Sequence, residues 1–191
     1  MQDLSLHILD IVENSVRAQA RNIWINIELN IMRNSLIIRI KDDGTGMDQD
    51  TLVKVHDPFY TTKTERVKKV GLGIPLFKQN AENSQGNFRI TSELGKGTEI
   101  TAEFRYDHID RLPLGKISDT LLAGIIGHPN TDYFIHLKRI KLDGEVLEFI
   151  FSTPDIKDVL GVVPLTYPDV IDYLEDVIQS GIKKIKMEEY Q

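Results

Sequence analysis

An aspartate followed by two closely spaced glycines is the first place in this sequence where residue types and spacing suit chemistry. Asp42 precedes Gly44 and Gly46, and it ends a run of alternating apolar residues that indicates a half-buried strand. Because glycine has no Cβ, the backbone can turn sharply there and approach a ligand closely. The aspartate can accept a hydrogen bond from a donor such as an exocyclic amine. An ordinary hairpin turn fits the same residues, so this stretch alone does not decide between a ligand site and a turn.

A stripe of polar side chains lies on a predicted amino-terminal helix over residues 5–20. Asp10, Asn14 and Arg17 follow one another at helical spacing, opposite the apolar face of that helix. A solvated polar face is the simpler interpretation. The stripe also offers an amide oxygen for a hard cation, with a carboxylate one turn before it and a guanidinium one turn after it. Since Mg²⁺ keeps several waters, one protein oxygen and substrate phosphates would suffice to hold it.

Two later stretches contain glycines beside regular elements. Gly71, Leu72 and Gly73 open a predicted helix over residues 74–82, and the N–H groups and dipole of a helix amino terminus favour anions such as phosphate. Thr98 follows a glycine-containing turn at the start of a strand, where its hydroxyl would face a bound ring. Each stretch is also compatible with a plain turn.

The elements that must position these residues give an α+β pattern in two units. The first unit, residues 1–107, contains the helices and strands around the glycine stretches, and the second, residues 115–191, is a small α+β unit. We expect the second unit to be an interaction or dimerisation module. Its predicted elements are a helix over 117–126, a hairpin over 133–140 and 146–151, helices over 156–160 and 168–180, and a solvated tail over 183–189.

Composition narrows the class of protein. The chain has 191 residues, of which 41% are hydrophobic and 27% charged, so it can bury a core. It has no cysteine, which excludes disulfides, thiolate metal sites and cysteine nucleophiles. Its amino terminus has neither a basic flank nor a long apolar segment, so we expect a cytoplasmic protein without a membrane partner. A formal net charge of −6 argues against broad nucleic-acid binding.

Taken together and in order, these stretches resemble the Bergerat ATP-binding domain of the GHKL superfamily, which includes DNA gyrase B, heat-shock-90 chaperones, histidine kinases and MutL. Neither the P-loop pattern nor the dinucleotide pattern is present. The resemblance implies a two-layer α/β sandwich for residues 1–107. It rests on residues 10–18 as the N box, 42–47, 71–73 and 95–98 as the three glycine boxes, and 57–63 as the phenylalanine box of nitrogen-regulatory histidine kinases.

The resemblance implies ATP and Mg²⁺ as cofactors and gives a role to each matching position. Asn14 would ligate the Mg²⁺, and Asp42 would accept a hydrogen bond from the adenine amino group, helped by a bound water and Thr98. Asp10 matches the glutamate that activates water in hydrolytic members, and we expect its shorter side chain to be a less efficient base. The other positions that the resemblance places around the nucleotide are Arg17, Gly44, Gly46, Met47, Lys63, Gly71, Leu72 and Gly73.

Three hypotheses for function follow. The first is a histidine-kinase-like signalling protein that transfers phosphate in trans to a partner protein, because Arg17 and Lys63 match histidine kinases. A sensor kinase has its acceptor histidine upstream of this domain, whereas here the N box begins at residue 10 and His7 is expected to be structural. The second hypothesis is an ATP-driven conformational switch with slow hydrolysis, and the third is a nucleotide sensor without turnover. The sequence leaves open which protein is the partner and whether the chain forms a homodimer.

Overall fold

The computed structural model describes residues 2–55 and 73–187, and its main element is one mixed sheet of six strands in the order β3-β4-β2-β1-β5-β6. Neighbouring strands are antiparallel except β1 and β5, which run parallel. The strands are β1 (Asn22–Asn30), β2 (Ser35–Asp42), β3 (Asn87–Glu93), β4 (Gly97–Arg105), β5 (Asp132–Ile140) and β6 (Val146–Ser152), and the helices are α1 (Leu4–Arg17), α2 (Gln49–Lys54), α3 (Gly73–Asn83), α4 (Ile117–Gly127), α5 (Thr153–Leu160) and α6 (Pro168–Ile185).

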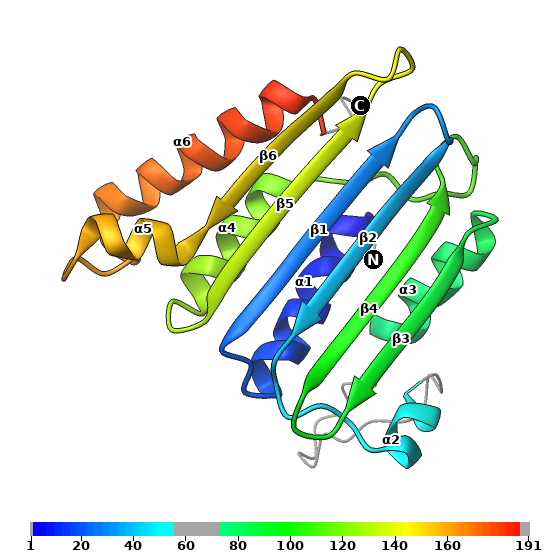
Figure 1. Cartoon of the computed structure of the whole chain (residues 1–191), viewed down its shortest axis with the longest axis horizontal. Helices are drawn as coiled ribbons and strands as arrows, with labels where there is room; N and C mark the ends of the chain where they lie inside the picture. The colour runs from blue at the N-terminus through cyan, green and yellow to red at the C-terminus, as the bar shows by residue number, and fades with distance from the viewer. Residues whose placement is uncertain (1, 56–72, 188–191) are drawn as a thin grey trace.

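The helices α1, α3, α4 and α6 lie along one face of the sheet (Figure 1). Alternation explains this arrangement: Ile23, Ile25 and Ile27 of β1 are buried, and the residues between them are only partly so. On the other face, Trp24 stacks on Phe134 with ring centroids 5.5 Å apart. The chain is therefore the predicted two-layer α/β sandwich, with its hydrophobic core between the sheet and the helices.

The carboxy-terminal segment extends this sheet and has no separate sheet of its own. Strand β5 pairs in parallel with β1 along its whole length, from Asn22 opposite Asp132 to Asn30 opposite Ile140. A parallel pair needs a crossover, and α4 supplies it while packing against α1. The predicted hairpin is present as β5 and β6, joined antiparallel. A role of this segment in interaction or dimerisation stays a prediction.

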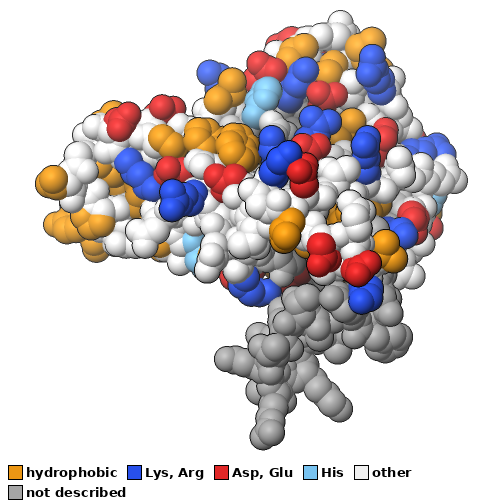
Figure 2. Space-filling view, turned by 60° about the horizontal axis from the view of Figure 1, so that its bottom comes forward, with side chains coloured by type: hydrophobic (Ala, Val, Ile, Leu, Met, Phe, Trp, Pro, Cys, Tyr) orange, Lys and Arg blue, Asp and Glu red, His pale blue; other side chains and the backbone are white. Residues whose placement is uncertain are grey.

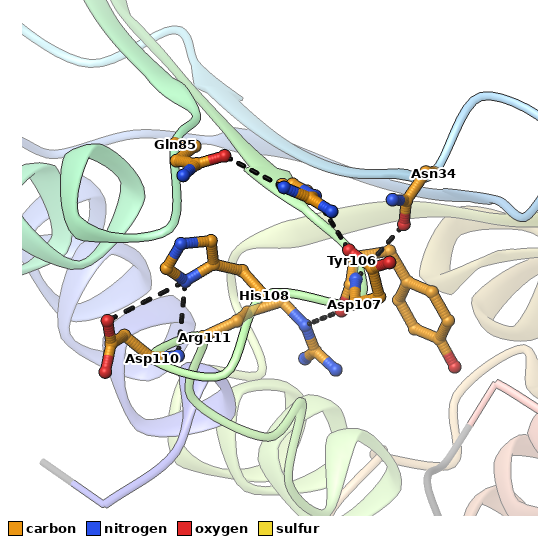
Figure 3. A network of polar contacts seen from close by, with 8 residues as sticks. Asn34, Gln85, Tyr106, Asp107, His108, Asp110 and Arg111 are labelled. Carbon is orange, nitrogen blue, oxygen red and sulfur yellow. Dashed lines mark hydrogen bonds and ion pairs between the residues drawn. The ribbon is translucent and has the colours of Figure 1, made fainter.

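The stretch at the predicted boundary between the two units, which begins at residue 107, is fixed by polar contacts (Figure 3). Arg105 Nε donates to Asp107 Oδ1 at 2.8 Å, and the Asp107 N–H donates to Asn34 Oδ1 at 3.1 Å. Arg111 Nε donates to the Tyr106 carbonyl at 2.6 Å, and its guanidinium lies over the Tyr106 ring. These bonds tie the connection to the β1–β2 turn, so the chain passes to α4 through an ordered corner.

The last helix is longer than predicted. Helix α6 runs through Gly181 to Ile185 and ends at Lys186, which has a left-handed φ of 52°. Gly181 does not stop the helix. Glycine is present there for packing, since an added Cβ would lie 2.2 Å from Cε2 of Phe149 on β6. The expectation of a solvated tail from residue 183 is therefore wrong for Ile185 and Met187, which are buried, while the lysines between and before them are exposed.

Exposed hydrophobic side chains gather at one end of the molecule. Figure 2 shows them at the left-hand tip, the end that carries α5 and the connection to α6. Val159, Val162, Tyr167 and Tyr173 are all more than half exposed, and Val162 is fully so. Exposed apolar side chains that lie together on a folded domain mark surfaces that interact with partners.

Candidate functional site

The carboxylate of Asp42 lies at the end of β2 and is the buried centre of the predicted site. The side chain is only 5% exposed. Its Oδ1 accepts from the backbone N–H of Gly44 at 2.9 Å and of Thr98 at 3.2 Å. Its Oδ2 accepts from the Ser15 hydroxyl on α1 at 2.8 Å. Three elements therefore hold one carboxylate in a fixed orientation.

This carboxylate has capacity for one more donor. An ionised carboxyl group offers about four lone-pair positions, two on each oxygen. Both positions on Oδ1 of Asp42 are used by backbone amides, whereas among residues 2–55 and 73–187 Ser15 is the one donor to Oδ2. A buried, oriented acceptor with one open position suits a ligand that brings a single N–H donor, such as an amino group on an aromatic ring.

Two glycines allow the backbone around Asp42 to pack closely. Gly46 has a φ of +65°, and a Cβ added there would lie 2.0 Å from the Glu93 carbonyl oxygen. Gly97 has a φ of +93°, and a Cβ there would lie 2.0 Å from the Asp42 carbonyl oxygen. No other residue type fits either position without moving the backbone. The end of β2 and the β3–β4 turn thus form one rigid corner.

The hydroxyl of Ser92 fixes Thr98 and Met47 beside that corner. Ser92 Oγ accepts from the Met47 N–H at 2.8 Å and donates to the Gly97 carbonyl at 2.9 Å. It also lies 2.9 Å from Thr98 Oγ1. The Thr98 hydroxyl is therefore held near Asp42, where the sequence placed it.

The stripe on α1 forms a connected row of side chains. Asn14 Nδ2 donates to Asp10 Oδ2 at 3.4 Å, and Arg17 Nη1 donates to Asn14 Oδ1 at 2.8 Å. Asn14 Oδ1 is thus already paired with a guanidinium, which repels a cation. A metal ion at this oxygen requires Arg17 to turn away, and phosphate oxygens would attract the guanidinium outward.

The carboxylate of Asp10 rests against the start of α3. A Cβ added to Gly73 would lie 1.6 Å from Asp10 Oδ2, so glycine is required for this approach. The N box and the last residue of the second glycine box therefore meet in the fold. Gly71, Leu72 and Lys63 lie outside the described residues. Within the described ranges, no group of three or more His, Cys, Asp or Glu side chains could hold a metal ion.

His7 packs as a structural residue between α1 and α3. It is 1% exposed, and its ring stacks on Phe77 with centroids 5.3 Å apart. Its Nε2 lies 2.9 Å from Asn80 Nδ2. Burial, helped by the positive chain terminus, lowers the pKa of His7 to about 4, so the ring is neutral at pH 7.

Sequence reasoning missed two residues of this site and one link to the rest of the chain. Ser15 lies on the buried, mainly apolar face of α1, and Ser92 lies within strand β3, so the local pattern gives each residue a place in an element and not a role at the site. A hydroxyl on an otherwise apolar face was the available signal for Ser15. The missed link is the Glu13 carboxylate on α1, which lies 2.7 Å from Nε2 of His128, the residue that follows α4. The N-box helix is therefore coupled to the carboxy-terminal segment.

Comparison with known proteins identifies the family to which this chain belongs. Residues 2–108, more than half of the chain, match the family model of the histidine kinase-, DNA gyrase B- and HSP90-like ATPases. The chain belongs to this family, the GHKL superfamily with the Bergerat ATP-binding fold.

Relatives with similar sequences include bacterial sensor kinases. A putative sensor protein of Shewanella frigidimarina is 34% identical over 104 residues, which cover 54% of this chain and 16% of that protein. Sporulation kinase C of Bacillus subtilis is 32% identical over 90 residues, which cover 47% of this chain and 20% of the kinase. The matched part of this chain thus spans a fifth or less of the length of these two relatives.

A solved structure shares the fold across a larger part of the chain. The N-terminal domain of a DNA repair protein matches 85% of this chain and 58% of its own with a TM-score of 0.50 and 14% identity. At that identity the likeness concerns the fold alone. Among the described residues, no helix is long and apolar enough to cross a lipid bilayer.

Proposed function

We propose that this chain binds Mg-ATP and, as a histidine-kinase-like signalling phosphotransferase, passes the γ-phosphoryl group to a partner protein in the cytoplasm. In that reaction the bond between the γ-phosphorus and the bridging oxygen of ADP breaks, and a bond to a partner side chain forms. The observation that carries the proposal is the buried Asp42 carboxylate with one open acceptor position. This carboxylate lies beside Thr98, and its donor Ser15 directly follows Asn14 on α1.

The residues at the site divide the binding of Mg-ATP between them. Asp42 would accept from the adenine amino group, with Thr98 and Met47 beside the ring. Asn14 would hold the Mg²⁺ once Arg17 moves toward the phosphates, where its charge would balance theirs. Bound Mg²⁺ supplies charge neutralisation on the phosphate oxygens.

The position of Asp10 supports transfer more than hydrolysis. A general base must reach the proton that it removes, within hydrogen-bond distance or through one water. Asp10 Oδ2 faces Asn14 Nδ2 and lies against the start of α3. The carboxylate therefore orients Asn14 and borders the helix amino terminus, a positioning role that needs no water activation.

Calorimetry with and without Mg²⁺ tests the binding part of the proposal. We expect Asn14→Ala to lose the Mg²⁺ dependence of ATP binding while keeping its Mg²⁺-free affinity. Asn26→Ala is the matched control, because Asn26 alternates with the buried Ile25 and Ile27 and therefore points to the opposite face of the sheet. If Asn14→Ala retained the full Mg²⁺ effect, Asn14 would not be the metal ligand.

Labelled ATP tests the transfer part. With γ-labelled ATP and fractionated partner proteins, transfer would label a protein in trans, while hydrolysis would release only labelled phosphate. Label on a partner that disappears with Asp42→Asn would support the kinase proposal. Release of phosphate alone would favour the second candidate.

That second candidate is an ATP-driven conformational switch, and the contact between Glu13 and His128 favours it. Glu13 precedes the proposed metal ligand on α1, and His128 follows α4 in the carboxy-terminal segment. Any displacement of α1 on ATP binding would therefore be passed to α4. An Asp10→Asn variant with unchanged phosphate release would show that Asp10 is not the base, and would count against a switch that depends on hydrolysis assisted by this residue.

A further inference from the structure

The outward face of α6 has a segregated row of charges. Six exposed residues follow one another alternately three and four positions apart, which places the first five in one stripe along the helix, and the sixth is the C-cap at its end. The stripe lies roughly opposite the buried residues Leu174, Ile178 and Ile182. From its start to its end it reads Asp169, Asp172, Asp176, Gln179, Lys183 and Lys186.

The helix dipole explains only part of this pattern. Acidic residues at the start of a helix and basic residues at its end are stabilising, but the effect falls off within the first and last turns. Asp172, Glu175 and Asp176 lie beyond the first turn of α6. Residues 158–182 contain five acidic side chains and no Lys, Arg or His. The dipole therefore leaves the inner acidic charges of α6 unexplained.

The charged side chains of the stripe are also free to pair with another molecule. Within the described parts of the chain, the side chains of Asp169, Asp172, Asp176, Lys183 and Lys186 have no ion pair. In Figure 1, α6 is the outermost helix at the β6 edge of the sheet. Its stripe therefore offers unpaired acidic charge at one end and unpaired basic charge at the other.

We propose that two copies of this chain associate through their α6 helices, packed antiparallel across a two-fold axis. A two-fold axis brings the same surface of both copies together. If residue i of the first copy contacts residue j of the second, then residue j of the first copy also contacts residue i of the second. With the axis midway along the stripe, Asp172 of each copy faces Lys183 of the other. The same operation places Asp169 opposite Lys186, and Asp176 opposite Gln179. The stripe is thus complementary to its own reversed copy.

Both flanks of the stripe agree with this arrangement. Tyr173 and Lys184 are eleven residues apart, which is three turns of helix, so both lie on one flank of the stripe. The two-fold axis brings the Tyr173 ring of one copy beside the Lys184 ammonium of the other. On the other flank is a half-open hollow of about 340 Å³, whose charged lining residues are Lys116, Asp119, Lys183 and Lys186, with Lys116 paired to Asp119 at 3.9 Å. Glu175, hydrogen-bonded at 2.8 Å to Gln179 beside that hollow, lies on the same flank and would face the hollow of the second copy.

Charged, exposed pairs give a weak and salt-sensitive association. Individual exposed pairs contribute little, and salt screens them over about 10 Å at 0.1 M. The face of one helix is also smaller than a standard permanent interface. We therefore expect a reversible dimer that populates at high protein concentration and low salt, and that dissociates as salt is added.

Charge reversal with mixing tests the proposal by sedimentation equilibrium of the whole chain. Asp172→Lys alone and Lys183→Glu alone each place like charges opposite one another twice, so each variant should dimerise at least about tenfold more weakly. An equimolar mixture of the two variants restores both opposite-charge pairs and should form a heterodimer close to wild-type strength. Glu103→Lys makes the same charge change on β4, remote from α6, and should leave the dimer intact.

The outcomes separate cleanly. Recovery in the mixture, with circular dichroism showing folded variants, supports the antiparallel pairing. A wild-type chain that stays monomeric at about 1 mM in low salt would overturn the proposal, since that concentration probes the weakest specific complexes. A dimer that neither variant weakens would also overturn it. ATP affinity, measured on the same variants, should not change, so failure here is distinct from failure of the proposed function.

Discussion

The corner around Asp42 and the outer face of α6 are both polar, but they handle polar groups in opposite ways. At the corner, a carboxylate is buried and three donors from α1, β4 and the β2 end orient it. On α6, the charged side chains are exposed to solvent, where the proposed second copy can reach them. A buried, oriented acceptor requires a ligand of defined shape, whereas exposed charges tolerate a partner that comes and goes. The contrast is why we propose a small-molecule site at the first region and a partner surface at the second.

The largest effect should come from breaking the rigidity of the corner. Gly46→Ala puts a Cβ 2.0 Å from the Glu93 carbonyl at a positive φ, so we expect a loss of unfolding free energy of at least about 3 kcal/mol. Gly127→Ala is the control, because a Cβ there meets nothing within 4 Å. Urea denaturation of both variants measures the difference. Equal stability of the two variants would show that the corner is not rigid.

The charge of the buried acceptor should matter nearly as much. Asp42→Asn puts an NH₂ group toward either the ligand amine or the two backbone amides, donor against donor, so ATP affinity should fall about 100-fold, ~3 kcal/mol. Asp43→Asn is the matched control: its carboxylate is occupied by Arg21 and Asn22, and these hydrogen bonds outweigh desolvation to lower its pKa. We expect that variant to bind ATP normally in calorimetry. Similar losses in both would remove Asp42 from its proposed role.

Acid should lower the stability of the folded chain through His7. The pKa of His7 is about 4 in the folded chain against an ordinary 6.5, so the unfolded chain takes up the proton first as the pH falls. This contribution is complete above pH 6.5 and is lost as the pH falls toward 4, by at most about 3 kcal/mol. His7→Gln keeps a neutral hydrogen-bonding group against Asn80. Its stability, followed by urea denaturation from pH 7 to 4, should therefore show a shallower slope than the wild type.

The smallest effect should come from removing one of three donors. Ser15→Ala leaves the two backbone amides on Asp42 and removes only the bond to Oδ2, so ATP affinity should fall about fivefold, ~1 kcal/mol. Ser84→Ala removes a hydroxyl that donates to the Asn80 carbonyl, away from the site, and should leave affinity unchanged. If Ser15→Ala bound ATP as tightly as the wild type, the backbone amides alone would suffice to orient the carboxylate.

Local pattern predicted most of the elements and the residues that meet at the site. The alternating isoleucines of β1 and the stripe on α1 needed only short-range periodicity, whereas the glycine boxes were identified through the resemblance to the GHKL superfamily. The placement of β5 beside β1 could not be predicted, because strand pairing between distant segments leaves no local pattern. The same limit applies to Gly181, which resembles a helix stop in sequence but accommodates Phe149 in space. Ser15 and Ser92 were missed because their roles depend on residues from other elements.

The parallel pairing of β1 with β5 also has a consequence for how the chain folds and can be divided. During synthesis, β1 and β2 form long before β5 emerges, so one side of β1 has a row of unpaired N–H and C=O groups until the carboxy-terminal segment arrives. A fragment cut at residue 107 would keep that bare side permanently, with the buried isoleucines of β1 next to it. The family-matched half is therefore expected to aggregate when expressed alone. In the whole chain, β5 of the carboxy-terminal segment covers the edge of β1 and prevents this.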